Sequence, residues 1–269
     1  MKICTFNVNG IRARLHQLEK LIEKHSPDII GVQEIKCVDD AFPKAVINSL
    51  GYHVESFGQK GHYGVALLSK TKPITLSKGF PNDNEDSQKR IISATYELDN
   101  NETIKLINGY FPQGENREHT VKFPAKKKFY EDLLSFLANS FSPKDNLIIM
   151  GDMNVAPNDL DIGIGEHNKL RWLKTGKCSF LPEERDWLNG IKNWGIYDLF
   201  RELHPNDSNL YSWFDYRSDG FRDNRGLRID LILGTQAIKR MCRSIEIDYE
   251  IRGMEKPSDH CPVIATIIS

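Results

Sequence analysis

Short apolar segments recur along the chain, and most of them have the length and pattern of β-strands. Even the longest uninterrupted apolar runs, such as residues 65–68 and 147–150, contain only four residues. Runs this short exclude a transmembrane helix and the core of a signal peptide. The segments that predict strands are Lys2–Val8, Asp28–Gln33, Tyr63–Leu68, Ile91–Leu98, Thr103–Asn108, Leu147–Met150, Ile229–Leu233, Ile245–Tyr249 and Val263–Ile268.

Two segments instead have helical spacing. Apolar residues at 15, 18, 21 and 22 predict a helix that ends at Ser26-Pro27, and those at 129, 133, 136 and 137 predict a long helix with Pro124 in its first turn. A turn is expected at residues 99–101. Strands thus outnumber helices without alternating with them, which favours a layered α/β sandwich over a Rossmann fold or a TIM barrel. Because no repeat or linker interrupts the chain, we expect a single domain spanning residues 1–269.

Polar residues that could take part in catalysis or bind a metal follow or interrupt these predicted strands. They are Asn7, Glu34, Tyr110, Asp152, Asn154, Asp230, Asp259 and His260. Strand ends are where rigid scaffolds place reactive groups, although an aspartate after a strand is also a common turn residue. Asp230 is harder to explain in that way, because a carboxylate within an apolar strand is costly without a partner.

The chemistry of this set is that of a hard metal ion. Carboxylates and amides suit Mg²⁺, and a histidine beside acids can transfer a proton near neutral pH. The five cysteines form no C-x-x-C pair, so neither a soft-metal site nor a disulfide framework is expected. No glycine-rich nucleotide-binding loop is present, which argues against a nucleotide cofactor.

The charge distribution is uneven although the net charge is only −1. Lysines and arginines gather at residues 61–78, 122–128 and 169–177. A nearly neutral protein can therefore present a basic face to a polyanion, while any one such cluster can also be ordinary solvated surface.

Nine segments in order along almost the whole chain give a specific resemblance. They are FNVNGIRAR (6–14), VQEIK (32–36), GQKGHYGVALLSK (58–70), NGYFPQG (108–114), MGDMN (150–154), DLDIGIG (159–165), FDYRS (214–218), DNRGLRID (223–230) and EKPSDHCPV (255–263). The ordered set resembles the exonuclease III family of abasic-site endonucleases, within the endonuclease/exonuclease/phosphatase superfamily. The resemblance implies a DNase I-like four-layer α/β sandwich, in which two packed mixed sheets are flanked by helices.

The resemblance also implies a reaction and the residues that perform it. The reaction is Mg²⁺-dependent cleavage of DNA 5′ to abasic sites, with processing of 3′ ends as a 3′→5′ exonuclease and 3′-phosphatase; Mn²⁺ is expected to substitute. Glu34 would bind the metal with Asn7, Asp259, Asp152 and Asn154 near it. Asp152 would position and deprotonate the attacking water, and Asn154 would hold that water or the phosphate. His260, oriented by Asp230, would contact the scissile phosphate, and Tyr110 the phosphate or the leaving oxygen.

DNA contacts are expected to be made to the backbone, because repair of a missing base requires indifference to sequence. The candidates are Arg12, Arg14, Gln113, Lys126 and Arg217, with Trp213, Leu227 and Ile229 as a wall for the sugar that lacks its base. The two arginines can equally be helix-surface charge, and the tryptophan can be a core residue.

The expected partner is double-stranded DNA with abasic sites or blocked 3′ ends, bound by a monomer in the bacterial cytoplasm and at the nucleoid, with no membrane. Two rival functions remain possible from the sequence. A superfamily phosphodiesterase acting on phosphoinositides or sphingomyelin would share the MGDMN and Asp-His elements, but DLDIGIG and FDYRS are not expected in it. A non-catalytic nucleic-acid-binding regulator could lose members of the chemical set, and this chain has lost none of them.

Overall fold

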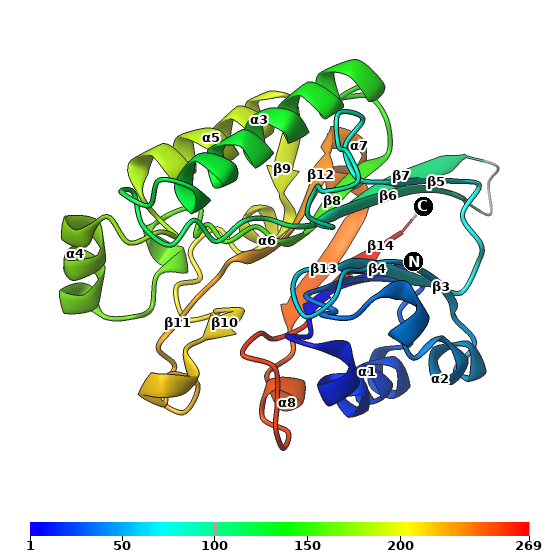
Figure 1. Ribbon diagram of the computed structural model, residues 1–269, viewed down its shortest axis with the longest axis horizontal. Coiled ribbons are helices and arrows are strands. Elements are labelled where there is room, and N and C mark those ends of the chain that lie inside the picture. The colour runs from blue at the N-terminus through cyan, green and yellow to red at the C-terminus, as the bar shows by residue number, and fades with distance from the viewer. Residues whose placement is uncertain (99–101, 269) are drawn as a thin grey trace.

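Two six-stranded sheets pack face to face in the computed structural model, which describes residues 1–98 and 102–268 (Figure 1). The first sheet has the order β13-β14-β1-β2-β4-β3, and the second has the order β5-β6-β7-β8-β12-β9. The first consists of β1 (Lys2–Asn7), β2 (Ile29–Gln33), β3 (His53–Phe57), β4 (Val65–Ser69), β13 (Cys242–Ile247) and β14 (Val263–Ile267). The second consists of β5 (Thr75–Lys78), β6 (Ile91–Glu97), β7 (Thr103–Tyr110), β8 (Leu147–Asp152), β9 (Ile196–Asp198) and β12 (Asp230–Thr235).

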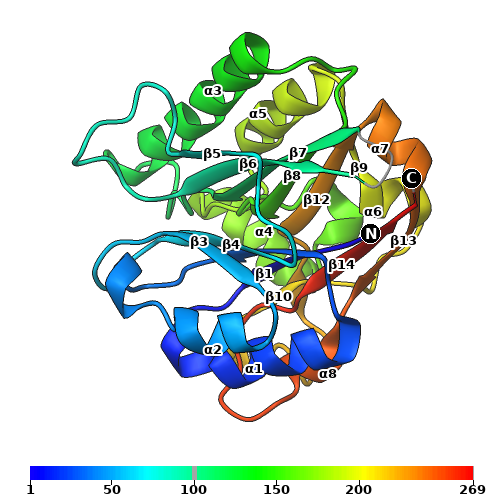
Figure 2. The same ribbon diagram turned by 90° about the vertical axis from the view of Figure 1, so that its right-hand side faces the viewer.

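Helices cover the outer face of each sheet, which gives four layers (Figure 2). On the first sheet lie α1 (Ile11–His25), α2 (Lys44–Ser49) and α8 (Tyr249–Arg252), and on the second lie α3 (Lys122–Ser140) and α5 (Pro182–Asn193). The remaining elements are α4 (Glu166–Thr175), α6 (Leu199–Leu203), α7 (Gln236–Met241), the ribbon β10 (Trp213–Phe214) and β11 (Gly226–Leu227), and the short 3₁₀ turns Asp39–Ala41, Asp159–Asp161 and Tyr216–Ser218. The predicted fold class is confirmed.

Apolar side chains fill three interfaces between these layers. One cluster, which includes Leu67, Leu106 and Ile232, lies between the two sheets. A second packs α1 against the first sheet, and a third packs α3 and α5 against the second. Strands covered on both faces are expected to be apolar throughout, which explains why the sequence shows continuous apolar runs in place of alternation.

A polar bridge crosses the interface between the sheets. Asn108 on β7 donates from its amide to the carbonyl oxygens of Val32 and Ala66, and its own oxygen accepts from the amide of Gln33. The two sheets approach closely at this point, since a Cβ on Gly31 would lie 2.8 Å from the Asn108 oxygen. The bridge fixes β2 and β7, whose carboxyl ends carry Glu34 and Tyr110.

Both predicted helices and all nine predicted strands are present. Each strand differs from its prediction at one end or both, and two of these differences have identifiable reasons. The strand predicted at Ile245–Tyr249 is β13, which ends at Ile247 because Asp248 caps α8 by accepting from the Ile251 amide at 3.1 Å. The strand predicted from Tyr63 begins at Val65, because Tyr63 has a left-handed φ of 54°. The turn expected at 99–101 lies outside the described residues. No helix in the described part of the chain is long and apolar enough to cross a membrane.

Candidate active site

The chemical set predicted from the sequence converges at one end of the sandwich. β1 and β2 are parallel neighbours in one sheet, and β7 and β8 are parallel neighbours in the other. The carboxyl ends of these four strands bring together Asn7, Glu34, Tyr110 and Asp152. β12 runs antiparallel to β8 and begins at the same end, with Asp230 paired directly opposite Asp152. The pairing of the strands therefore brings these side chains together at one end of the sandwich.

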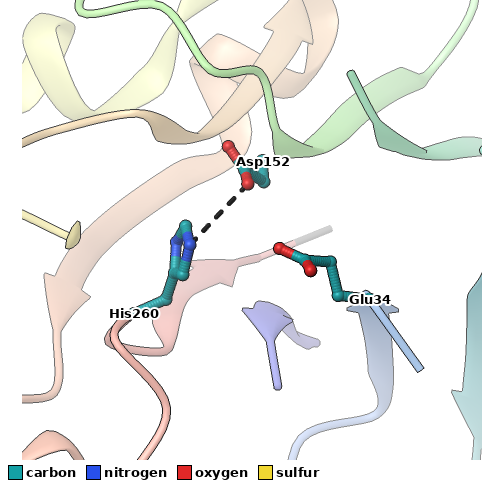
Figure 3. A group of neighbouring side chains, drawn as sticks. All are labelled: Glu34, Asp152 and His260. Atoms are coloured by element: carbon teal, nitrogen blue, oxygen red, sulfur yellow. Dashed lines mark ion pairs between the residues drawn. The ribbon is translucent and has the colours of Figure 1, made fainter. Parts of the chain in front are cut away.

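Glu34, Asp152 and His260 form the centre of the group (Figure 3). One ligand atom from each lies within 4.8 Å of the others. The imidazole Nε2 of His260 is 3.8 Å from Oδ2 of Asp152, which is too long for a hydrogen bond but within the range of an ion pair. Glu34 projects from a backbone with a φ of 51° directly after β2, and this left-handed turn directs its carboxylate toward the other two side chains.

Asn7 holds the two carboxylates together. Its side-chain nitrogen donates to Oε1 of Glu34 and to Oδ2 of Asp152, each at 2.9 Å. Its oxygen accepts from the backbone amide of Asn9, so that oxygen faces away from the carboxylates. In this arrangement Asn7 positions the acids.

His260 and Asp230 form a buried pair. Nδ1 of the imidazole donates to Oδ2 of Asp230 at 2.8 Å, and both side chains are almost fully enclosed. The hydroxyl of Ser212 accepts from the backbone amides of Ile229 and Asp230, which fixes the start of β12. The partner that Asp230 required inside an apolar strand is thus the histidine, and the pair leaves Nε2 directed toward Asp152.

Burial and mutual charge shift the pKa values of this group. Burial raises the pKa of Asp152 to about 7, with further upward contributions from Asp230 and Glu34 that the His260 charge and the Asn7 hydrogen bond oppose. For His260, burial lowers the pKa, but the carboxylates of Asp230, Asp152 and Asp259 outweigh it and raise the value to about 10. The imidazole is therefore the charged, donating form at neutral pH, beside an acid that titrates near neutrality.

These groups face a cleft of about 700 Å³. The predicted residues that line it are Glu34, Tyr110, Gln113, Asp152, Asn154, Trp213, Arg217, Ile229, Asp259 and His260. Asp259 accepts from the side chains of Asn9 at 2.9 Å and Trp213 at 3.1 Å, which ties the loop before β14 to one wall. A cleft of this volume is typical of small-molecule and nucleotide sites.

A family model described as the endonuclease/exonuclease/phosphatase family matches residues 4–260. The chain belongs to this family. It is 57% identical to exodeoxyribonuclease III of Haemophilus influenzae, over 98% of this chain and 99% of that protein. Two solved structures superpose over their full length and the full length of this chain with a TM-score of 0.90 and 34% identity. They are a 3′-5′ exonuclease from Neisseria meningitidis and an AP endonuclease from Archaeoglobus fulgidus.

Two of the expected DNA contacts are wrong in this family member. Lys126 was expected to reach a phosphate, but its side chain is completely buried and bonded to Glu184. Lys126 shares the inward face of α3 with Phe129, Tyr130 and Leu133, so helical phase turns it away from the solvent although its neighbours Lys127 and Lys128 are exposed. Leu227 was expected to line the sugar pocket, but it has no exposed surface and lies in the apolar cluster behind the wall, together with Ile229 and in packing contact with Trp213.

Arg12 and Arg14 lie outside the residues that line the cleft. Arg12 is exposed near the start of α1, and Arg14 donates to the carbonyl oxygen of Asn9 at 2.9 Å. In the structure, Arg14 therefore stabilises the loop that carries Asn9.

Several residues of the site carried no distinct signal in the sequence. The guanidinium of Arg90 lies 4.0 Å from the ring centre of Tyr63 and 4.8 Å from that of Tyr110, and it donates to the Tyr110 carbonyl oxygen at 3.0 Å. Stacking between residues that are distant in the sequence leaves no periodic pattern from which it could be predicted. Asn9 lies within the FNVNGIRAR segment and is identifiable from it. The cleft is also lined by Glu115, Trp172, Lys177, Ser179, Asp215 and Tyr216.

The acids at the centre of the cleft fit a divalent cation. Carboxylate oxygens are the preferred ligands of hard cations, and Glu34 and Asp152 share one amide donor with their oxygens close together. The charged form of His260 has no lone pair to offer a metal, so the carboxylates are the better ligands of the three. The ammonium of Lys36 lies 2.9 Å from Oε2 of Glu34 and is the cation that pairs with this carboxylate in the structure.

Proposed function

We propose that this chain is a Mg²⁺-dependent DNA repair phosphodiesterase of the exonuclease III type. It cleaves duplex DNA 5′ to abasic sites and processes 3′ ends, as a 3′→5′ exonuclease and as a 3′-phosphatase. The observation that carries the proposal is the buried His260–Asp230 pair at 2.8 Å, aimed at the carboxylate of Asp152 inside a cleft with Glu34. A structure of the Neisseria 3′-phosphatase, 33% identical to this chain with a TM-score of 0.90, contains a product DNA hairpin.

The residues divide the work of hydrolysis among them. Asp152, with a pKa of about 7, holds the attacking water and accepts its proton as the water reaches the phosphorus. The charged imidazole of His260 donates from Nε2 to a phosphate oxygen, where negative charge develops. Asp230 keeps the imidazole in that orientation. A Mg²⁺ ion held at Glu34, with Asp259, Asp152 and Asn154 around it and Asn7 keeping the Glu34 and Asp152 carboxylates together, would supply further positive charge to the phosphate.

Tyr110 and Asn154 complete the set in this proposal, Tyr110 at the phosphate and Asn154 at the water or the metal. Burial raises the pKa of the Tyr110 hydroxyl well above its usual value, and the Glu34 and Asp152 charges add to that effect. The phenol therefore stays protonated and donates to the phosphate or the leaving oxygen. The Asn154 amide nitrogen is engaged by the Phe111 carbonyl oxygen at 2.9 Å, so its side-chain oxygen is the atom left for water or metal.

The walls of the cleft suggest how DNA is held. Arg217 and Gln113 line the mouth, and Trp213 and Ile229 form an apolar wall beside Asp259 and His260. We propose that the arginine contacts backbone phosphate and that the wall accepts a sugar without its base, with Arg12 and Arg14 as outer contacts. The enzyme would act as a single-domain monomer in the bacterial cytoplasm, associating with the nucleoid at damage, and Mn²⁺ would replace Mg²⁺.

A cleavage assay tests the proposal directly. A labelled duplex with one abasic site is incubated with the purified protein and Mg²⁺, with excess EDTA, and with Mg²⁺ restored after EDTA. We expect incision only in the first and third reactions, and none by Asp152→Asn, which controls for contaminating nucleases. Phosphoinositide and sphingomyelin substrates are tested in parallel. Hydrolysis of those lipids without incision of the DNA would overturn the proposal.

A further inference from the structure

A buried ion pair lies directly behind the wall of the cleft. Lys126 on α3 and Glu184 on α5 are both fully enclosed, and the ammonium donates to Oε1 of the carboxylate. Burying two charges costs about as much as their attraction returns, so a pair of this kind is weak grounds for a purely stabilising role. The other contacts of the pair are therefore informative.

The ammonium of Lys126 binds two segments that line the cleft. It donates to the carbonyl oxygen of Asn154 at 2.8 Å and to that of Gln113 at 3.2 Å. Asn154 has a left-handed φ of 52°, and its backbone N–H also donates to Oδ1 of Asp152 at 3.0 Å. A residue in this backbone region persists where surrounding contacts determine its conformation. Lys126 thus helps fix the loop that follows the proposed catalytic acid.

The carboxylate of Glu184 binds a third segment. Its Oε2 accepts from the backbone amides of Ser179 and Leu181, each at 2.8 Å, and Ser179 lines the cleft. Packing around the pair leaves no slack, because a Cβ on Gly114 would lie 2.9 Å from the Cys178 sulfur and 3.0 Å from Cδ of Lys126. One ion pair therefore joins the Gln113, Asn154 and Ser179 segments.

We propose that Lys126 is a positioning residue for phosphodiester cleavage, acting through the backbone of Asn154 and Gln113 and not through contact with DNA. This rests on the proposed function. Without its two carbonyl contacts, the loop after Asp152 would relax relative to the His260–Asp230 pair. A displacement of about 1 Å in a catalytic group can cost about 10²-fold in rate. The loss should fall on kcat, since no part of Lys126 is exposed to substrate.

The main test variant avoids leaving one charge buried alone. Lys126→Met combined with Glu184→Gln removes both charges at similar volume and keeps an oxygen for the Ser179 and Leu181 amides. Glu184→Gln alone keeps the lysine and its two carbonyl contacts. Lys20→Met is the matched control, because Lys20 is a partly exposed lysine on α1 that pairs only with Glu23 among the described residues. Melting temperature, kcat and KM are measured for each on one abasic-site duplex, well below the lowest melting temperature.

The proposal predicts that kcat of the double variant falls by about 10²-fold while KM changes by less than about threefold. Lys20→Met should keep kcat within about threefold of the unmodified chain, and Glu184→Gln should lose less kcat than the double variant because Lys126 keeps its two carbonyl contacts. A folded double variant with unchanged kcat, or one in which only KM rises, would overturn the proposal. A loss in Glu184→Gln equal to that of the double variant would do so as well. If the double variant does not fold, Lys126→Gln with Glu184→Gln is judged by the same criterion. An inactive unmodified chain would refute the proposed function itself.

Discussion

Individual side chains in the cleft are controlled by a small number of partners. Asp230 is tolerated inside an apolar strand because the imidazole of His260 binds it, and Glu34 is tolerated beside Asp152 because Asn7 donates to both. The sequence predicted that such partners exist, because a buried carboxylate requires a hydrogen-bond or ion-pair partner. The identity of each partner depends on the distances that the fold creates.

Glu34→Ala should lower DNA cleavage by at least about 10²-fold while the fold survives, because it removes the proposed metal ligand at the least enclosed acid of the central group. Raised Mg²⁺ should restore part of the loss. Initial rates over a Mg²⁺ titration measure this, with circular dichroism to confirm folding. The exposed Glu19→Ala is the control. Full activity of Glu34→Ala at low Mg²⁺ would remove Glu34 from the ligand set.

Asp230→Ala and His260→Ala should each lower kcat by about 10²–10³-fold, and the double variant should be little worse than the more damaging single change. The reason is that Asp230 acts only through the orientation and charge of the imidazole, to which it is bonded at 2.8 Å. Steady-state kinetics of the three variants give the coupling. Losses that add in the logarithm of kcat would show that the two residues act independently.

Trp213→Ala should reduce incision at an abasic site much more than removal of a 3′-phosphate from a matched duplex. Trp213 and Ile229 line the cleft, and only the first reaction requires an internal sugar to turn out of the helix. Both rates are measured on the same preparations, together with the melting temperature. The indole also donates to Asp259, so equal losses on the two substrates would indicate a general role in holding that loop.

At the scale of elements, the sequence predicted whether a segment is a helix or a strand. It predicted less well which side chains of that segment face the solvent. The strand ends that carry Glu34, Tyr110 and Asp152 were predicted because apolar runs end there. The three consecutive lysines of α3 suggested a basic surface, but their side chains point in different directions around the helix. Lys126 lies on the same buried face of the helix as residues 129, 130 and 133. Lys127 and Lys128 are exposed and pair with acidic residues one turn later. A run of like charges gives no indication of helical phase.

A buried network joins β11, β9 and the Asp159–Asp161 turn, and it should contribute strongly to stability. The guanidinium of Arg228 donates to Asp161 at 2.6 Å and to Asp198 at 2.6 and 3.1 Å. Arg228→Met should lower the free energy of unfolding by about 3–5 kcal/mol, because it leaves the buried Asp198 carboxylate without its arginine and Asp161 with Arg201 alone. Urea unfolding measures the change. Arg222→Met, which breaks only an exposed pair with Asp219 and Asp223, is the control. A loss no larger than that of the control would contradict this account.

At the scale of the whole molecule, the layered sandwich was predictable because its strands are short, apolar and not separated by regular helices. The pairing of strands distant in sequence was not. β14 lies beside β1 and β12 beside β8, and only this order brings Asp259-His260 and Asp230 to the carboxyl ends of β1, β2, β7 and β8. Apolar patterns establish that strands exist, and the resemblance to a family supplied their arrangement.

In the function proposed here, the cleft of this molecule adds water to a phosphodiester 5′ to an abasic sugar. Cleavage of a duplex with one natural abasic site in oxygen-18 water, with Mg²⁺ and analysis of both fragments by mass spectrometry, tests it most directly. Hydrolysis places oxygen-18 on the 5′-phosphate of the abasic fragment and leaves an unlabelled 3′-hydroxyl on the other. An unlabelled phosphate with an unsaturated aldehyde at the 3′ end would show elimination, and would contradict the proposed roles of Asp152 and His260.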